Sequence, residues 1–177
     1  LYTDLNIPRG LTAVIGSGGK TTLLAQLADE LPGTMLLTTT THIRPFPHCP
    51  CVTDGSAEAV RHLLKKNRIV CLGTPAPGGK LTAPSLPFSI LVQLADFVLA
   101  EADGARGLPL KAHEGWEPVI PPDSGQVICV VGASGFGKPI CKAVHRPARF
   151  CALTGAQPEE AASPALVAQA LLTESLA

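Results

Sequence analysis

The stretch LTAVIGSGGKTT, residues 11–22, decides the fold of this chain. Its first part, Leu11–Ile15, is an apolar run that predicts a strand, and its second part, Gly16–Thr22, opens a helical pattern. A glycine-rich turn between a strand and a helix that ends in Gly-Lys-Thr is typical of proteins that hold nucleotide phosphates. The glycines let backbone N–H groups face one concavity, and the helix adds the positive end of its dipole.

This pattern assigns a function to each residue of the turn. Lys20 would reach the β- and γ-phosphates as a catalytic cation, and the Thr21 hydroxyl would ligate Mg²⁺. The full P-loop pattern would place a glycine at position 14, where this chain has Val14, so the shorter G-x-x-G-K-T-T loop resembles that of the Mur ligases. The alternative is a glycine-rich turn before a helix that binds nothing. The predicted ligand is ATP or another NTP, and the residues predicted to bind it are Gly16, Ser17, Gly18, Gly19, Lys20, Thr21 and Thr22.

Composition limits the remaining possibilities. The chain has 177 residues, of which 46% are hydrophobic and 16% charged, so we expect one globular domain over residues 1–177. Its formal net charge is +0, which gives no electrostatic argument for nucleic acid or an anionic membrane as a partner. No apolar run approaches the about 18 residues of a membrane span, and the N-terminus has no signal-like stretch. We therefore expect a cytoplasmic protein.

Six scattered cysteines fit this expectation, because a reduced cytoplasmic protein keeps free thiols. Cys71 and Cys129 lie in apolar, strand-like runs, and we expect both to be buried. The segment His48-Cys49-Pro50-Cys51 has a C-x-C spacing without a second pair, so we do not assign a zinc site to it.

Alternation of strand-like and helix-like segments predicts an α/β fold with a parallel sheet. More specifically, we expect a three-layer parallel sheet of P-loop NTPase type with about five or more strands. The predicted strands are residues 11–15, 35–38, 69–72, 96–100 and 127–131. The predicted helices are residues 19–31, 54–66 and 85–93 and a last helix that begins at Ser163-Pro164, with a loop or small hairpin in 73–87.

Polar residues follow several of these strands, and parallel strands deliver their carboxyl ends to one edge of a sheet. Glu101 and Asp103 come after the fourth strand, where a P-loop protein places a metal-binding acid. We predict that both bind Mg²⁺ and that Asp103 also orients the attacking group. The alternative is that the two acids simply end a buried strand at the surface. In the threonine run 38–41, Thr40 is a further predicted metal ligand, unless it serves only as a strand residue.

A second glycine-rich segment, residues 132–138, resembles a phosphate loop but ends differently. Pro139 follows Lys138 where a Ser or Thr would stand, and proline also removes a backbone donor. We expect a mobile substrate loop here.

Five blocks in order resemble the YqeC family, the selenium-dependent molybdenum hydroxylase accessory proteins. The resemblance extends from about residue 11 to 155, and the blocks are GSGGKTT (16–22), LTTTTHI (37–43), EADGARGLPLK (101–111), EPVIP (117–121), and GKP with HRP (137–139 and 145–147). The resemblance implies a P-loop fold and a part in maturing molybdenum enzymes that carry labile selenium. Family members run beyond this point, so we expect that a C-terminal segment is missing here.

The same blocks point to further site residues. Lys111 is predicted to be catalytic, contacting phosphate or a substrate anion, with a solvated loop lysine as the alternative. His145-Arg146 would be either a charge-stabilising arm or a structural pair. We expect His113 to be a surface loop residue, with an acid–base group as the alternative. We expect Trp116 to be a core anchor rather than a stacking platform.

These observations predict a Mg²⁺-dependent NTPase or transferase acting in the maturation of selenium-dependent molybdenum hydroxylases. Its expected partners are a nucleotide, a small anionic second substrate or cofactor and a molybdenum hydroxylase, with neither nucleic acid nor membrane. Two alternatives stay open: a Mur-like ATP-dependent ligase, and a non-catalytic nucleotide-switched chaperone that hands over a cofactor.

Overall fold

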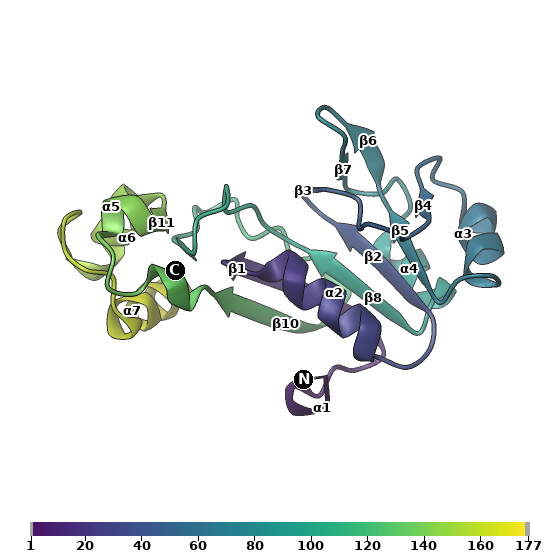
Figure 1. Ribbon diagram of the computed structural model, residues 1–177, viewed down its shortest axis with the longest axis horizontal. Helices are drawn as coiled ribbons and strands as arrows, with labels where there is room; N and C mark the ends of the chain where they lie inside the picture. Colours follow the sequence, from purple (N-terminus) through teal and green to yellow (C-terminus); the bar gives the residue numbers. More distant parts are fainter. Residues whose placement is uncertain (1, 176–177) are drawn as a thin grey trace. The chain divides into compact units, whose positions relative to one another are not determined.

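The computed structural model describes residues 2–175, and the chain divides into two compact units (Figure 1). Unit 1 contains the N-terminal residues through Ile15 together with Lys20–Asp103 and Val119–Ile128. Unit 2 contains Gly16–Gly19, Gly104–Pro118 and the chain from Cys129 onward. Each unit has a hydrophobic core of its own.

A six-stranded sheet with the order β10-β1-β8-β2-β5-β4 is the main element of the fold. Adjacent strands from β1 to β4 pair in parallel, which confirms the predicted parallel α/β sheet. The apolar strand β8 lies between β1 and β2 with every residue buried. The strands are β1 Gly10–Ser17, β2 Met35–Thr39, β4 Cys51–Val52, β5 Ile69–Leu72, β8 Phe97–Glu101 and β10 Ser124–Val131.

Helices cover both faces of the sheet in unit 1, so the predicted three layers are present (Figure 1). Leu36 of β2 and Val98 of β8 share a core cluster with Val60 of α3 and Leu91 of α4. Successive side chains of a strand point to opposite faces, so the residues after Leu36 and Val98 face the other side. There α2 packs against β2 and β8. The helices of unit 1 are α1 Tyr2–Leu5, α2 Lys20–Glu30, α3 Ala57–Leu64 and α4 Phe88–Leu94.

The glycine- and proline-rich stretch 73–87 contains the small hairpin that the sequence predicts. Strands β6 Thr74–Ala76 and β7 Lys80–Thr82 pair antiparallel, and β3 His42–Ile43 adds a third strand to them. The following segment leads into α4 and returns the chain to the central strand β8.

Unit 2 is built mainly from short helices around a core that includes Phe150, Leu110 and Val144. Strand β9, Leu110–Lys111, pairs in parallel with β11, Val144–His145. The predicted Ser163-Pro164 helix start is confirmed, because the Ser163 hydroxyl accepts a hydrogen bond from the Leu166 N–H at 3.3 Å. The helices are the 3₁₀ turn η1 Ala133–Gly135, α5 Ile140–Ala143, α6 Pro147–Thr154 and α7 Pro164–Ser175.

Two predictions about the strands need correction. Strand β1 continues through Ser17, two residues past the predicted end, because Gly16 lies against the Val130 backbone of β10. Cys71 is buried as expected, but Cys129 is exposed. Strand β10 is at the edge of the sheet and its burial alternates along its length, so an apolar sequence there does not imply that both faces are covered.

Among residues 2–175, no helix combines the length and the apolar character that crossing a membrane requires.

Candidate functional site

Lys20, the first residue of α2, is almost fully buried in unit 1 and contacts two carboxylates. Its Nζ lies 2.9 Å from Asp103 Oδ1 and 3.9 Å from Glu101 Oε1. Asp103 is 0% exposed, so this acid depends on the lysine for its compensation. Both acids reach the same ammonium group, which confirms that a spacing of two directs their side chains to one side.

The Thr21 hydroxyl joins this group by donating a hydrogen bond to Glu101 Oε2 at 3.1 Å. We call Lys20, Thr21, Glu101 and Asp103 the Lys20 cluster. Its position follows from the sheet, because Val14 of β1, Glu101 of β8 and Thr39 of β2 are aligned in register. The cluster therefore lies at the carboxyl ends of central parallel strands, where α/β proteins place their ligands.

In the threonine run 38–41, two hydroxyls make structural hydrogen bonds and one remains a candidate metal ligand. Thr38 donates its hydroxyl to the Leu72 carbonyl and Thr39 donates its own to the Glu101 carbonyl, each at 2.8 Å. The Thr40 N–H also donates to the Glu101 carbonyl, at 3.0 Å. Within residues 2–175, however, the buried Thr40 hydroxyl has no hydrogen-bond partner. A buried hydroxyl without a partner is costly, so Thr40 stays a predicted metal ligand.

The donor set of the Lys20 cluster fits Mg²⁺. One ammonium and two carboxylates give a net charge of −1, and Mg²⁺ prefers carboxylate, hydroxyl and phosphate oxygens. In the described part of the chain, no group of three or more His, Cys, Asp or Glu side chains is arranged to hold a metal ion. A bound Mg²⁺ would therefore take several ligands from phosphate and water, as this ion commonly does.

The glycines of the turn, seen within unit 2, are required by packing. Gly18 has φ +79°, and a Cβ there would come within 2.5 Å of the Gly132 Cα and 2.7 Å of the Pro109 carbonyl oxygen. A Cβ on Gly16 would come within 2.2 Å of the Val130 carbonyl oxygen. Because packing alone requires glycine at these positions, their presence does not show whether the turn is a phosphate loop or a plain turn. The case for a ligand depends on the Lys20 cluster.

The other residues predicted to bind nucleotide belong to the same turn and the helix after it. Ser17 is buried at the end of β1, and Gly19, with φ +130°, leads directly into α2. Thr21 and Thr22 are exposed in the first turn of α2. The exposure of these two threonines leaves the start of the helix accessible to a ligand.

Lys111 in unit 2 is buried and ion-paired, which excludes the solvated loop lysine as an alternative. Its Nζ donates to the Gly104 carbonyl at 2.6 Å and pairs with Glu117. Arg146 binds the same carboxylate through two nitrogens, at 2.7 and 3.0 Å, and also donates to the Ala112 carbonyl. We call Lys111, Glu117 and Arg146 the Glu117 cluster. These contacts of Arg146 favour the structural alternative for this residue, and the charge-stabilising alternative for the His145-Arg146 pair stays a prediction.

The surroundings of Glu117 make its carboxyl group more acidic than an ordinary glutamate. Burial by itself raises the pKa of this carboxyl, but hydrogen bonds from Arg146 and Lys111 outweigh burial and lower the pKa from 4.5 to about 2. Burial and the positive charges of Arg146 and Lys111 also lower the pKa of His145 below its usual 6.5. Both groups therefore keep one protonation state near pH 7.

Two expectations about unit 2 are wrong. His113 is 5% exposed rather than on the surface, because Glu174 accepts from its backbone N–H at 2.6 Å and lies 2.7 Å from its ring Nδ1. Trp116 is 71% exposed rather than a core anchor. Its ring lies 5.9 Å from the Arg146 guanidinium, so it covers a cation instead of filling a core.

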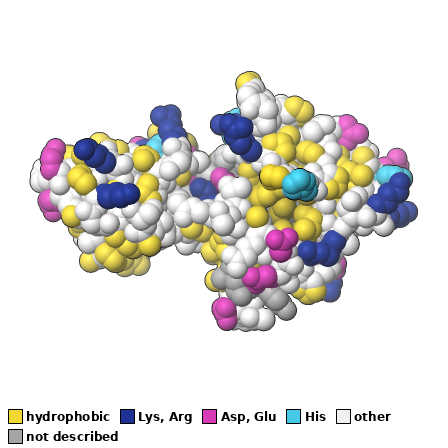
Figure 2. Space-filling model, viewed as in Figure 1, with side chains coloured by type: hydrophobic (Ala, Val, Ile, Leu, Met, Phe, Trp, Pro, Cys, Tyr) yellow, Lys and Arg dark blue, Asp and Glu magenta, His cyan; other side chains and the backbone are white. Residues whose placement is uncertain are grey.

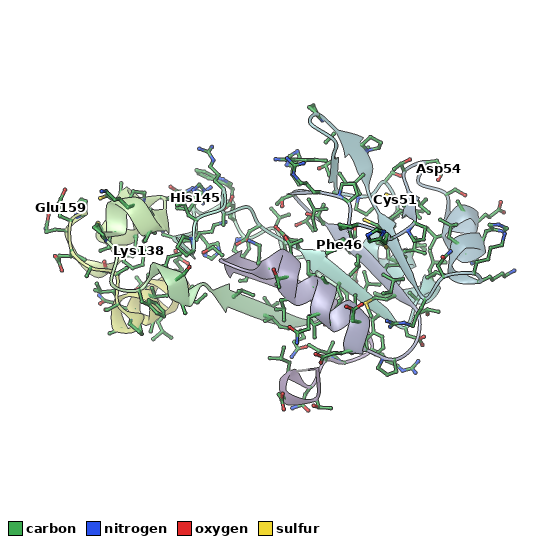
Figure 3. The ribbon with its side chains drawn as sticks, viewed as in Figure 1. Phe46, Cys51, Asp54, Lys138, His145 and Glu159 are labelled. Carbon is green, nitrogen blue, oxygen red and sulfur yellow. The ribbon has the colours of Figure 1, made fainter. Side chains whose placement is uncertain are left out.

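The second glycine-rich segment, 132–138, forms the turn η1 and is tied to a later part of unit 2. The Gly137 N–H donates to the Ala162 carbonyl, and the Ala162 N–H donates to the Lys138 carbonyl. Lys138 itself is exposed (Figure 3). Its mobility and its contact with a substrate stay predictions.

A hollow of about 400 Å³ in unit 1 contains no member of the Lys20 cluster. Phe46, His48, Cys49 and Arg68 are among the residues that line it. We assign no nucleotide base to it. On the face drawn in Figure 2, Lys and Arg side chains of the described residues are dispersed among acids rather than joined into one basic surface.

Comparison with known proteins gives a consistent result. A protein family described as YqeC protein matches residues 12–148. The "Uncharacterized protein YqeC" of Escherichia coli (strain K12) is 36% identical over 171 residues, which cover 90% of this chain and 67% of that protein. No solved structure matches the chain significantly. The matched region 12–148 includes the Lys20 cluster and the Glu117 cluster.

Proposed function

The chain belongs to the YqeC family, and we propose that it is a Mg²⁺-dependent NTPase or transferase that binds ATP or another NTP at the Lys20 cluster. The observation that carries this proposal is a buried lysine at the start of a helix, ion-paired with two acids at the end of a central strand. The Escherichia coli relative is uncharacterized, so the proposal rests on the residues of this chain.

In this proposal, Lys20 exchanges its ion pairs with Asp103 and Glu101 for a phosphate oxygen. The exchange keeps the ammonium group compensated, because each partner is an oxyanion. Glu101, Asp103 and the Thr21 hydroxyl are then available to bind a cation, directly or through water. Mg²⁺, when bound, would neutralise phosphate charge and polarise the phosphoryl group that is transferred.

The two acids differ in ways that suggest separate functions. Glu101 accepts the Thr21 hydroxyl, which stands where a P-loop protein places its magnesium ligand. Asp103 has no solvent exposure and follows Glu101 in an extended segment. We propose that Glu101 binds Mg²⁺ and that Asp103 orients the attacking group as well as supporting the metal.

The second substrate would be a small anion. The Glu117 cluster carries two cations and one carboxylate, a net charge of +1, which favours an anion. Lys111 would contact that anion only if it gave up one of its present bonds to Gly104 or Glu117. We propose this catalytic function for Lys111 on the basis of charge alone.

A hydrolysis assay tests the nucleotide part. Glu101→Gln and Asp103→Asn should each lower Mg²⁺-dependent ATP hydrolysis by about 10- to 100-fold, since a charge-assisted contact contributes about 1.5–3 kcal/mol. Lys80→Ala, which alters an exposed lysine of β7 that also follows two glycines, is the matched control and should keep the wild-type rate. A Glu101→Gln/Asp103→Asn variant that hydrolyses ATP like the wild type would refute the assignment.

The biological part is that the protein acts in the maturation of selenium-dependent molybdenum hydroxylases. It is supported by the resemblance of the five sequence blocks and by a pair of sites suited to a nucleotide and an anion. Cells without the gene should lose selenium-dependent hydroxylase activity and keep selenium-independent molybdoenzymes. The Lys20→Ala form should not restore the activity. Full hydroxylase activity in the deletion strain would remove this part and leave nucleotide binding unaffected.

A further inference from the structure

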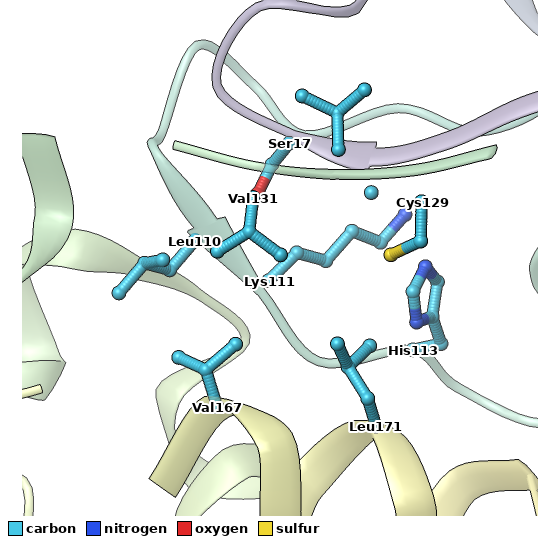
Figure 4. Close-up of a pocket in the computed structure, with 10 residues that line it drawn as sticks. Ser17, Leu110, Lys111, His113, Cys129, Val131, Val167 and Leu171 are labelled. Atoms are coloured by element: carbon cyan, nitrogen blue, oxygen red, sulfur yellow. The ribbon is translucent and has the colours of Figure 1, made fainter. Parts of the chain in front are cut away.

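A small cavity in unit 2 brings together a thiol, an imidazole and an ammonium group. Lys111, His113 and Cys129 line it together with apolar side chains of α7 (Figure 4), and Gly16 is also among the lining residues. The cavity holds about 10 Å³, which is room for about one water molecule. Neither the proposed nucleotide site nor its cation accounts for the cysteine and the histidine.

His113 is oriented by a carboxylate on α7. Its Nδ1 lies 2.7 Å from Glu174 Oε2, and the other oxygen of the same carboxylate accepts from the His113 N–H at 2.6 Å. A carboxylate at Nδ1 favours the tautomer that carries its proton there, which leaves Nε2 as a proton acceptor. In the view of Figure 4, the Cys129 sulfur lies between the end of the Lys111 side chain and the His113 ring. Nucleophile, base and orienting acid are thus arranged in sequence.

We propose that Cys129, His113 and Glu174 form a thiol-activating triad whose substrates are disulfides. Cys129 is an exposed residue, and we place the incoming disulfide on the solvent side of this residue rather than inside the cavity. Acyl transfer would need space for an oxyanion and donors aimed at it, and a cavity for one water does not provide that space. Attack on a disulfide is in line at sulfur and forms no oxyanion.

The exchange balances without a further oxidant or reductant. The Cys129 thiol gives its proton to His113 Nε2, and the thiolate attacks one sulfur of the disulfide RS–SR. A bond forms between the Cys129 sulfur and SR while the original S–S bond breaks. The leaving RS⁻ takes the proton from the His113 imidazolium. The products are a mixed disulfide on Cys129 and one thiol, RSH.

The other charged groups around Cys129 lie on β9, on α7 and in the Glu117 cluster. Lys111 extends from β9 and is paired with Glu117, which also binds Arg146, and Glu174 comes from α7. The residues of β10 and β1 that line the cavity carry no charge, and neither do Val167 and Leu171 of α7. Lys111 and Arg146 thus offset Glu117 and Glu174, so protonation of His113 decides whether the site favours a thiolate.

Other cysteines of the chain provide the contrast. Burial raises the pKa of the Cys49 thiol to about 11 and that of the Cys71 thiol to about 12, so both stay protonated near pH 7. Cys141 in α5 is exposed like Cys129 and shares no carboxylate-bound histidine in the described contacts. Cys141 is therefore the internal control, because it is an exposed cysteine like Cys129 but is not part of such a triad in the described contacts.

The test is the rate at which glutathione disulfide modifies each cysteine of the folded chain between pH 6 and 8, followed by peptide mass spectrometry. An ordinary thiol should react about tenfold faster for each unit of pH in this range. The rate at Cys141 is measured in the same samples for comparison. Cys129 should react about threefold faster than Cys141 at pH 7, because a larger thiolate fraction is partly offset by lower nucleophilicity. Its rate should also change little between pH 7 and 8.

Two variants connect the result to the triad. His113→Asn should give Cys129 the rate and the pH slope of Cys141, and Glu174→Gln should move the slope in the same direction while keeping the side-chain size. Cys141→Ser should leave the Cys129 profile unchanged. Equal rates and slopes for Cys129 and Cys141 in the wild type, or a Cys129 profile unaffected by both variants, would overturn the proposal. If His113→Asn does not fold, Glu174→Gln decides the question alone.

Discussion

Lys20 and Lys111 are two buried lysines, one in each unit, with opposite surroundings. Each is 5% exposed and each is ion-paired with a carboxylate. Lys20 has two acids for one cation, a net charge of −1. Lys111 shares the single acid Glu117 with Arg146, a net charge of +1. The first arrangement favours an additional cation, and the second favours an anion or no ligand at all.

The two clusters also differ in how firmly the backbone holds them. Lys111 and Arg146 each donate to a backbone carbonyl as well as to Glu117, so the Glu117 cluster ties separate segments of unit 2 together. Among the contacts described above, those of Lys20 with Glu101 and Asp103 are ion pairs between side chains. Side-chain ion pairs can be exchanged for a ligand without breaking a backbone contact. Burial and pairing of a lysine thus do not by themselves mark a functional residue.

The largest expected effect comes from breaking the Glu117 cluster. Glu117→Leu leaves Lys111 buried without its carboxylate and should lower the free energy of unfolding by about 3–5 kcal/mol, as measured by urea denaturation. Lys111→Met/Glu117→Leu removes both charges and should recover most of that loss. If Glu117→Leu lies within 1 kcal/mol of the wild type, the cluster does not stabilise unit 2 in the way described.

Acid should remove the same interaction in a defined range of pH. The pKa of Glu117 is about 2 in the folded protein and ordinarily 4.5, so its contribution is present above pH 4.5 and is lost as the pH falls toward 2. The loss amounts to at most about 3 kcal/mol. The Glu117→Gln variant should show a correspondingly flatter dependence of unfolding free energy on pH over this interval. An identical pH dependence in the two proteins would contradict the assigned pKa.

Sequence reasoning succeeded where local patterns are strong. Strand Ile69–Leu72 was predicted to the residue, and Ser163 was recognised as a helix cap, because apolar runs and caps are local features. Pairs such as Glu117 with Arg146 and His113 with Glu174 were missed, since their partners lie 29 and 61 residues apart. No local signal connects residues at that separation. Cys129 was misplaced because an apolar run does not reveal an edge strand.

Variants of Thr39 and Thr40, near the Lys20 cluster, should distinguish a structural threonine from a metal-binding one. Thr39→Val removes the bonds of its hydroxyl to the Glu101 carbonyl and the Thr41 N–H, and should cost about 1–3 kcal/mol of stability. Thr40→Val removes a buried hydroxyl without a described partner, so it should leave stability unchanged or raise it. If Thr40 is a metal ligand, the same variant should weaken Mg²⁺-ATP binding about tenfold. A Thr40→Val protein with unchanged affinity would exclude that ligand.

The smallest expected effect compares helix caps in the two units. Ser56 caps α3 in unit 1 by accepting from the Ala59 N–H at 3.1 Å, and Ser163 caps α7 in unit 2 at 3.3 Å. Either serine replaced by alanine should cost about 1 kcal/mol in thermal or urea unfolding. Ser163→Ala should leave ATP hydrolysis unchanged. A loss above about 2 kcal/mol would show that the serine does more than cap its helix.

Titration calorimetry of Mg²⁺-ATP tests the central claim, that Lys20 binds nucleotide phosphate, most directly. Lys20→Arg keeps the charge beside Glu101 and Asp103, so it should fold, but its planar guanidinium replaces the compact ammonium that would contact the phosphate. Both Lys20→Arg and Lys20→Ala should bind at least tenfold more weakly than the wild type, whereas the control Lys80→Ala should bind normally. Wild-type affinity in folded Lys20→Ala and Lys20→Arg proteins, or no binding by the wild type, would contradict the account.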